Sequence, residues 1–161
     1  VSLVFCHSTA GPLTIAVHPN WAPRGAERFL FLVGKQYFES RVPLFRCIQG
    51  WICQFGLPGS PHDLFQTLVP DPKDRELKDD VQWLPEGPKH RMHGTTKRFA
   101  QGYLAYAGGG PNTRDNQFIL ALEADGHLGG GSPWEVPWGE VVGPDSYVTL
   151  SRIYTGYGED G

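Results

Sequence analysis

The 161-residue sequence predicts a mainly β domain, built as a barrel or a sandwich. Short apolar segments that are typical of strands recur along the chain, and only two segments have the spacing of an amphipathic helix. The length fits a single domain that can bury a hydrophobic core, and no internal repeat divides it.

The chain begins with a predicted hairpin, followed by the first helix. Residues 1–7 are apolar and β-prone, and Gly11-Pro12 gives a turn. Large apolar residues then stand at every second position over 13–18, the pattern of a half-buried strand. Pro23 suits the first turn of a helix, and Gly34 suits its end. This helix would present one apolar face, made of Ala26, Phe29, Leu30 and Val33.

The rest of the chain predicts short strands, a late helix and one long irregular insertion. Strands are expected at residues 44–48, 51–55, 102–107, 117–122 and 138–142. A short helix is expected from Asp145 to about Ile153. Residues 57–100 contain six prolines and a charge-rich run, which indicates a long loop with little secondary structure. Loops of this length in a compact domain are usually functional or mobile.

Composition narrows the possible functions. The net charge of −3 and the pI of about 6.1 give no basic footprint for nucleic acid, and no apolar run is long enough to span a membrane. Of the three cysteines, Cys47 and Cys53 lie among apolar residues, so we expect buried free thiols, which fit a reducing compartment. The sequence gives no other indication of localisation. Without an initiator Met, we expect it to be a piece of a longer product.

Two segments carry the functional signal. In residues 41–56, Arg46 lies between apolar neighbours, eight residues before Gln54, with Trp51 between them. The second segment runs from Gly102 to Phe118. Together they resemble the two signature segments of the cyclophilins, the cyclosporin-binding peptidyl-prolyl isomerases.

The resemblance implies a closed antiparallel β-barrel with a helix capping each end. In the family, the last strand follows the second helix and pairs with the first strand. This sequence stops before that strand, so the strand lies in residues not included here, or the barrel has an open edge. An open edge would invite pairing with another chain.

The chemistry implied by the resemblance needs no nucleophile, cofactor or metal. Rotation about a peptide bond has a barrier of roughly 18–20 kcal/mol, because the nitrogen lone pair is delocalised into the carbonyl. An always-charged guanidinium that points at the prolyl nitrogen can withdraw that lone pair. In the family an arginine has this role, and the matching residue is Arg46. The matching Gln54 would bond the substrate backbone and steady Arg46.

The resemblance also implies the walls of a proline-binding cleft. Trp51 and Ile52 replace a phenylalanine and a methionine of the family, Gly108 replaces an asparagine, and Ile119 replaces a phenylalanine at the pocket floor. The substrate-binding residues implied are Trp51, Ile52, Gln54, Ala107, Gly108, Gly109, Gln117, Ile119 and Leu128.

A third family segment matches less well. A tryptophan, a leucine and a histidine usually line the far side of the pocket. Here His127 or Trp134 would stand near the tryptophan position, and Ser132 or Glu135 near that of the histidine. We therefore expect weak binding of cyclosporin.

Two functions follow. The first is a peptidyl-prolyl isomerase acting on proline-containing segments of proteins. The alternative is a cyclophilin fold with weak or no activity, which serves as a docking module of a larger assembly through residues 57–100.

Overall fold

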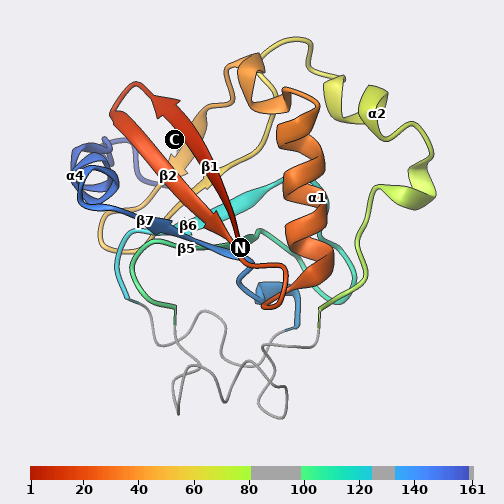
Figure 1. Cartoon of the computed structure of the whole chain (residues 1–161). Coiled ribbons are helices and arrows are strands. Elements are labelled where there is room, and N and C mark those ends of the chain that lie inside the picture. The colour runs from red at the N-terminus through yellow and green to blue at the C-terminus, as the bar shows by residue number, and fades with distance from the viewer. Residues whose placement is uncertain (81–98, 125–132, 160–161) are drawn as a thin grey trace.

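A computed structural model describes residues 1–80, 99–124 and 133–159. Its centre is one curled antiparallel sheet of seven strands, in the order β1-β2-β7-β5-β6-β4-β3 (Figure 1). The strands are β1 (Ser2–Ser8), β2 (Gly11–Val17), β3 (Leu44–Cys47), β4 (Ile52–Phe55), β5 (Tyr103–Tyr106), β6 (Phe118–Ala121) and β7 (Gly139–Val142). The mainly β fold that the sequence predicts is confirmed, and each of the last five strands lies within one residue of its predicted ends.

Both predicted helices are present, and they lie on opposite sides of the β1–β2 hairpin in Figure 1. Helix α1 (Pro23–Gly34) has its proline in the first turn and buries Ala26 and Phe29 of the predicted apolar face. Leu30 and Val33 are only partly buried, and the helix buries Leu32, which was not on that predicted face. Helix α4 (Pro144–Arg152) packs on β2, where the Ser146 hydroxyl accepts the Thr14 N–H at 2.8 Å. No described helix is long and apolar enough to cross a membrane.

The described part of the insertion is more regular than the sequence predicts. Residues 57–80 contain the helix α2 (Leu64–Leu68) and the 3-10 turn η2 (Pro72–Asp74). The Asp71 carboxylate accepts the Lys73 N–H at 3.0 Å, and this capping bond stabilises the start of η2. The sequence did not indicate these two short elements, although most of 57–80 is irregular as expected, while 81–98 lie outside the described part. Two further 3-10 turns are η1 (Tyr37–Ser40) and η3 (Pro133–Glu135).

Closure of the sheet into a barrel is not confirmed. Within the described residues, β1 and β3 are the two outer strands of the sheet. The segment that follows α4 approaches β3, where Gly158 forms a single antiparallel bridge with Cys47.

The expectation of free thiols at Cys47 and Cys53 is wrong, because the two cysteines form a disulfide. Strands β3 and β4 pair antiparallel across a tight connection, and this register places the two residues directly opposite each other. Their Cα atoms are 4.1 Å apart. Cys6 on β1 is the free cysteine among the described residues, and burial raises the pKa of its thiol.

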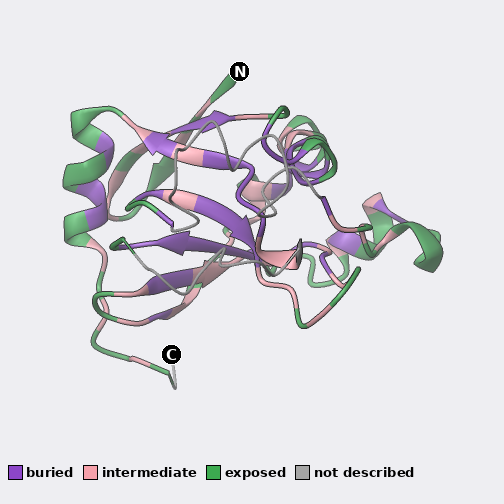
Figure 2. Ribbon diagram, turned by 90° about the horizontal axis from the view of Figure 1, so that it is seen from below, coloured by how far each residue is buried: buried purple, intermediate pink, exposed green. Residues whose placement is uncertain are grey.

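An aromatic core joins α1 to the concave side of the sheet. Phe29, Phe118 and Trp138 are each at most 1% exposed, and the ring of Trp138 lies 4.2 Å from that of Phe29 and 5.7 Å from that of Phe118. Figure 2 shows buried residues along the strands and on α1. Phe118 is thus the core aromatic that the sequence predicts, and its strand carries the neighbouring Ile119 to the opposite face.

Candidate functional site

A hollow of about 330 Å³ lies over the face of β4, β5 and β6 opposite the aromatic core. It brings together most of the residues that the resemblance implies: Arg46, Trp51, Ile52, Gln54, Ala107, Gly108, Gly109 and Ile119. Tyr106 and Glu135 also line it. Gln117 contacts this set through Gln54, whereas Leu128 and His127 lie outside the described residues.

Arg46 faces Gln54 because the β3–β4 hairpin pairs the two residues in register. The Arg46 Nη1 group donates to Gln54 Oε1 at 3.4 Å, a long bond, and Gln54 Nε2 donates to Gln117 Oε1 at 2.9 Å. The spacing of eight residues seen in the sequence is therefore the spacing of a cross-strand pair. The three polar side chains form one hydrogen-bonded row, of which Arg46 and Gln54 line the hollow.

The guanidinium of Arg46 also lies over an aromatic ring. Its central carbon is 5.5 Å from the centroid of Trp51, within the range of a cation–π contact. The Arg46 side chain is 26% exposed, so part of its surface is accessible to a ligand.

The floor of the hollow is apolar. Ile52 and Ile119 are 3% and 6% exposed, and they pack with Phe99, Ala105 and Ala121 in a small second core. Sequence reasoning missed Phe99, which is fully buried under the hollow at the end of the insertion. The floor can thus hold a proline ring, although the family's second aromatic is an isoleucine here.

Gly108 makes room for a neighbouring aromatic residue. A Cβ atom added at this position would lie 2.9 Å from the Cβ of Trp134, closer than side chains tolerate. Gly108 is not among the residues with positive φ. The space that Trp134 needs is therefore the physical reason for glycine where the family has asparagine.

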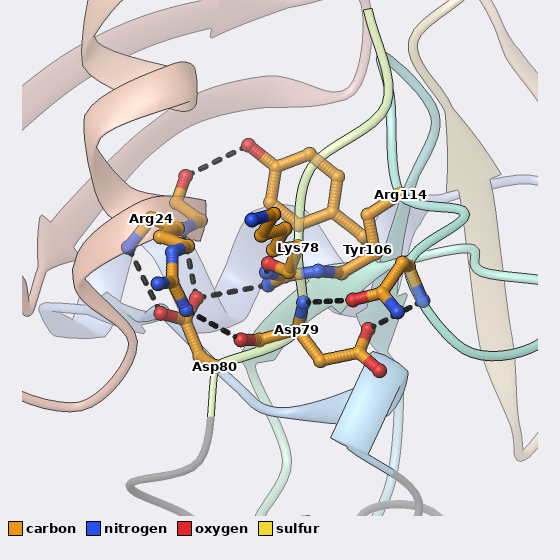
Figure 3. A network of polar contacts seen from close by, with 8 residues as sticks. Arg24, Lys78, Asp79, Asp80, Tyr106 and Arg114 are labelled. Atoms are coloured by element: carbon orange, nitrogen blue, oxygen red, sulfur yellow. Dashed lines mark hydrogen bonds and ion pairs between the residues drawn. The ribbon is translucent and has the colours of Figure 1, made fainter.

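The loop that carries Gly108 and Gly109 is held by residues 77–80, which we call the strap (Figure 3). Leu77 N–H donates to the Arg114 carbonyl at 2.6 Å. Asp79 and Asn112 exchange two hydrogen bonds, in which each side-chain oxygen accepts the backbone N–H of the other at 2.8 and 3.0 Å. The strap therefore fixes the loop that forms one wall of the hollow.

A buried ion pair anchors the strap. Asp80 Oδ2 accepts from Arg114 Nη1 at 3.0 Å, and both side chains are at most 1% exposed. The Asp80 carboxylate also accepts the backbone N–H groups of Arg24 and Gly25 at 3.0 and 2.9 Å. Asp80 thus caps the start of α1, where Ala22 offers no side-chain acceptor.

Tyr106 links the strap network to the hollow, which it also lines. The guanidinium of Arg114 lies 5.4 Å from the centre of its ring, and its hydroxyl donates to the Gly25 carbonyl at 2.7 Å. Burial raises the pKa of the Tyr106 hydroxyl, although the cations Arg28 and Arg114 lower it. The phenol is therefore a neutral donor that ties β5 to α1.

Sequence reasoning also missed Glu159, the residue that makes the most polar contacts with Arg46. Its carboxylate accepts from Arg46 Nε at 3.0 Å, and from Nη2 at 3.0 and 2.9 Å. Glu159 follows α4 and is 113 positions away in sequence, so no local pattern could indicate this contact.

Comparisons with known proteins agree with the resemblance. A family model described as "Cyclophilin type peptidyl-prolyl cis-trans isomerase/CLD" matches residues 3–160. The peptidyl-prolyl cis-trans isomerase-like 3 of Gibberella zeae is 27% identical over 150 residues, which cover 93% of this chain and 81% of that protein. The protein of the same name from Neurospora crassa is 26% identical over 161 residues, with the same two shares.

Solved structures share the fold. A cyclophilin-type isomerase of Cryptosporidium parvum, solved in the presence of the dipeptide Ala-Pro, has a TM-score of 0.61 at 19% identity, over 92% of this chain and 84% of that one. The cyclophilin AquaCyp293 of Hirschia baltica has the same TM-score at 17% identity, over 91% and 66%. These identities support the fold alone, but the family model spans nearly the whole sequence. The chain therefore belongs to the family of cyclophilin-type peptidyl-prolyl cis-trans isomerases.

Proposed function

We propose that this chain catalyses cis-trans isomerisation of Xaa-Pro bonds in protein substrates, with Arg46 as the electrophile. The observation that carries the proposal is the position of Arg46, at the rim of an open, apolar-floored hollow beside Gln54. Isomerisation requires only that the cleft bind the twisted bond better than either planar isomer. A guanidinium that donates to the prolyl nitrogen stabilises the twisted form, since that nitrogen regains its lone pair.

In this proposal the other cleft residues bind and orient the peptide. Ile52, Ile119 and Trp51 would hold the proline ring by burying its apolar surface. Gln54, which Gln117 orients, would bond the peptide backbone next to the reacting bond.

The backbone at Gly108 is the proposed partner of the extended peptide. The Ala107 N–H donates to the Gln117 carbonyl at 2.9 Å, and the Gly109 N–H donates to Thr113 Oγ1 at 2.9 Å. Since alternate amides of an extended segment point to opposite sides, the Gly108 amide between them would face the ligand. The Ala-Pro dipeptide used with the Cryptosporidium parvum protein supports a short proline peptide as the test ligand.

We also propose weak cyclosporin binding, because this cleft differs from that of the family on one wall. Trp134 packs against Gly108, and Glu135 lines the hollow near the position of the family histidine. Titration by isothermal calorimetry is expected to give a dissociation constant above the micromolar level. A submicromolar constant would contradict this proposal.

The docking alternative remains as an outcome of the test. It would require residues 57–100 to form the partner-facing surface, or to fill the hollow. None of the described insertion residues, 57–80 and 99–100, lines the hollow. The described insertion residues therefore do not fill the hollow, whereas a partner-facing role for them stays an outcome of the test.

The test is exchange NMR on an Ala-Pro peptide with wild type, Arg46→Ala and the control Arg152→Ala, an exposed arginine in the last turn of α4. Wild type and the control are expected to accelerate exchange equally. Arg46→Ala should lose about 100-fold or more, the usual cost of removing one electrostatic catalytic group. If folded wild type only matches the uncatalysed rate, the chain is a docking module.

A further inference from the structure

We infer that Glu159 is a positioning residue for Arg46, which holds its guanidinium with the Nη1 group toward Gln54 and the cleft. The inference rests on the proposed function of Arg46. It adds a residue from the segment after α4 to a site that otherwise comes from β3 to β6, the connections between these strands, and η3.

The guanidinium of Arg46 is contacted on three sides. The Glu159 carboxylate takes the edge made by Nε and Nη2, with three distances of 2.9–3.0 Å. The ring of Trp51 supports its face at 5.5 Å, and Gln54 accepts from Nη1. A carboxylate that spans Nε and Nη2 fixes the rotation of the planar group, because the fork geometry allows one orientation. Nη1 is then the donor directed along the rim.

Glu159 holds the arginine from outside the cleft and does not plug it. Arg46 lines the hollow, whereas Glu159 does not. The Glu159 side chain is 65% exposed, compared with 26% for Arg46, so the carboxylate lies on the solvent side of the pair. A peptide could therefore enter while the contact persists.

The backbone supports this placement. Gly158 forms the antiparallel bridge with Cys47, the residue next to Arg46 on β3. Gly158 has a φ of +61°, a left-handed conformation that costs glycine little. Its N–H donates to the Thr155 carbonyl at 3.3 Å, which closes a tight turn just before Glu159. The side chain following this turn is thus aimed at the arginine.

Loss of Glu159 is expected to lower kcat and to leave the fold unchanged. An exposed ion pair adds little to stability, so loss of Glu159 should leave the folded state intact. Because Glu159 does not line the hollow, the affinity for a proline peptide should be nearly unchanged. A guanidinium that samples other orientations would be correctly placed less often, and a roughly fivefold fall in kcat with an unchanged KM is the expected size, in line with an exposed pair.

The experiment compares wild type with Glu159→Gln, Glu159→Ala and the control Glu76→Gln, an exposed glutamate on the insertion. Exchange NMR gives kcat and KM for an Ala-Pro peptide, titration gives the peptide affinity, and ¹⁵N spectra report the Arg46 Nε–H signal. The Glu159 variants are expected to lose about fivefold in kcat, keep KM, and shift or broaden the Arg46 signal. The control should match wild type in all three measurements.

Two results would overturn the inference. Unchanged kcat in both Glu159 variants would show that the contact has no catalytic role, and a rise in kcat would show that Glu159 competes with substrate. If wild type itself has no activity, the proposed function fails instead. The Arg46 Nε–H signal would then still show whether Glu159 holds the guanidinium.

Discussion

Two arginine–carboxylate pairs in this molecule have similar bonds and opposite surroundings. Arg114 and Asp80 are 0% and 1% exposed, whereas Arg46 and Glu159 are 26% and 65% exposed. The closest N–O distances are 3.0 and 2.9 Å. We infer that burial, and not bond length, separates the pair that stabilises the fold from the pair at the proposed catalytic arginine.

Three additional hydrogen bonds support the buried pair. The Asp80 carboxylate also accepts two backbone N–H groups at the start of α1, and Arg114 donates to the Lys78 carbonyl at 2.5 Å. Such bonds offset the cost of removing two charges from water. The exposed pair keeps one donor of Arg46 beside the hollow, where a ligand can reach it.

The largest predicted effect is the loss of charge in the buried pair. Asp80→Asn leaves the Arg114 cation without its partner, and we expect the free energy of unfolding to fall by about 3–5 kcal/mol. Urea denaturation followed by circular dichroism measures this fall. The control is Asp79→Asn on the same strap, which keeps an acceptor oxygen for the Asn112 N–H and should cost less than about 1 kcal/mol. Equal losses in the two variants would contradict this comparison.

The disulfide between Cys47 and Cys53 joins β3, which carries Arg46, to β4, and it should stabilise this hairpin. Cys47 and Cys53 are six positions apart, and for so short a loop the chain-entropy relation gives about 2 kcal/mol of stabilisation. Treatment with a reductant should lower the thermal midpoint of wild type. A Cys47→Ala/Cys53→Ala double variant is the control, since it should show the lower midpoint with or without reductant. A wild-type midpoint that reductant does not change would argue against this link.

The loop that lines the hollow should be sensitive to side-chain volume at Gly108. Gly108→Asn would push against Trp134, and we expect a loss of about 1 kcal/mol or more, together with a changed tryptophan fluorescence spectrum. Gly109→Asn is the matched control, because a Cβ at that position meets nothing within 4 Å. If Gly108→Asn is as stable as this control, Trp134 does not occupy that space.

The smallest predicted effect is that of salt on kcat, and it acts through the exposed Arg46–Glu159 pair. Raising the ionic strength from 0.1 to 1 M shortens the Debye length from about 10 to 3 Å and weakens the Arg46–Glu159 contact. Wild-type kcat is expected to fall by about twofold, the size of a weak surface pair, while Glu159→Gln shows a smaller change. An equal decrease of kcat in both proteins would show that salt does not act through the Arg46–Glu159 contact, and would contradict this prediction.

Contacts within one hairpin could be predicted from the sequence, whereas contacts between distant segments could not. Arg46, Trp51 and Gln54 belong to one hairpin, so local spacing and the family resemblance were enough to place them together. The Arg46–Glu159 and Asp80–Arg114 contacts join segments far apart in the chain, and single charged residues in loops have no periodic signal. The disulfide was missed because apolar neighbours indicate burial equally for free and bonded cysteines.

The most direct test of the central claim is Arg46→Lys, measured by exchange NMR on an Ala-Pro peptide and by urea denaturation. Lysine keeps the charge but loses the planar fork that Glu159, Trp51 and Gln54 hold. We predict that wild type accelerates exchange, and that Arg46→Lys loses at least about tenfold while its free energy of unfolding changes by less than about 1 kcal/mol. A lysine variant as active as wild type, or a folded wild type without activity, would contradict the account.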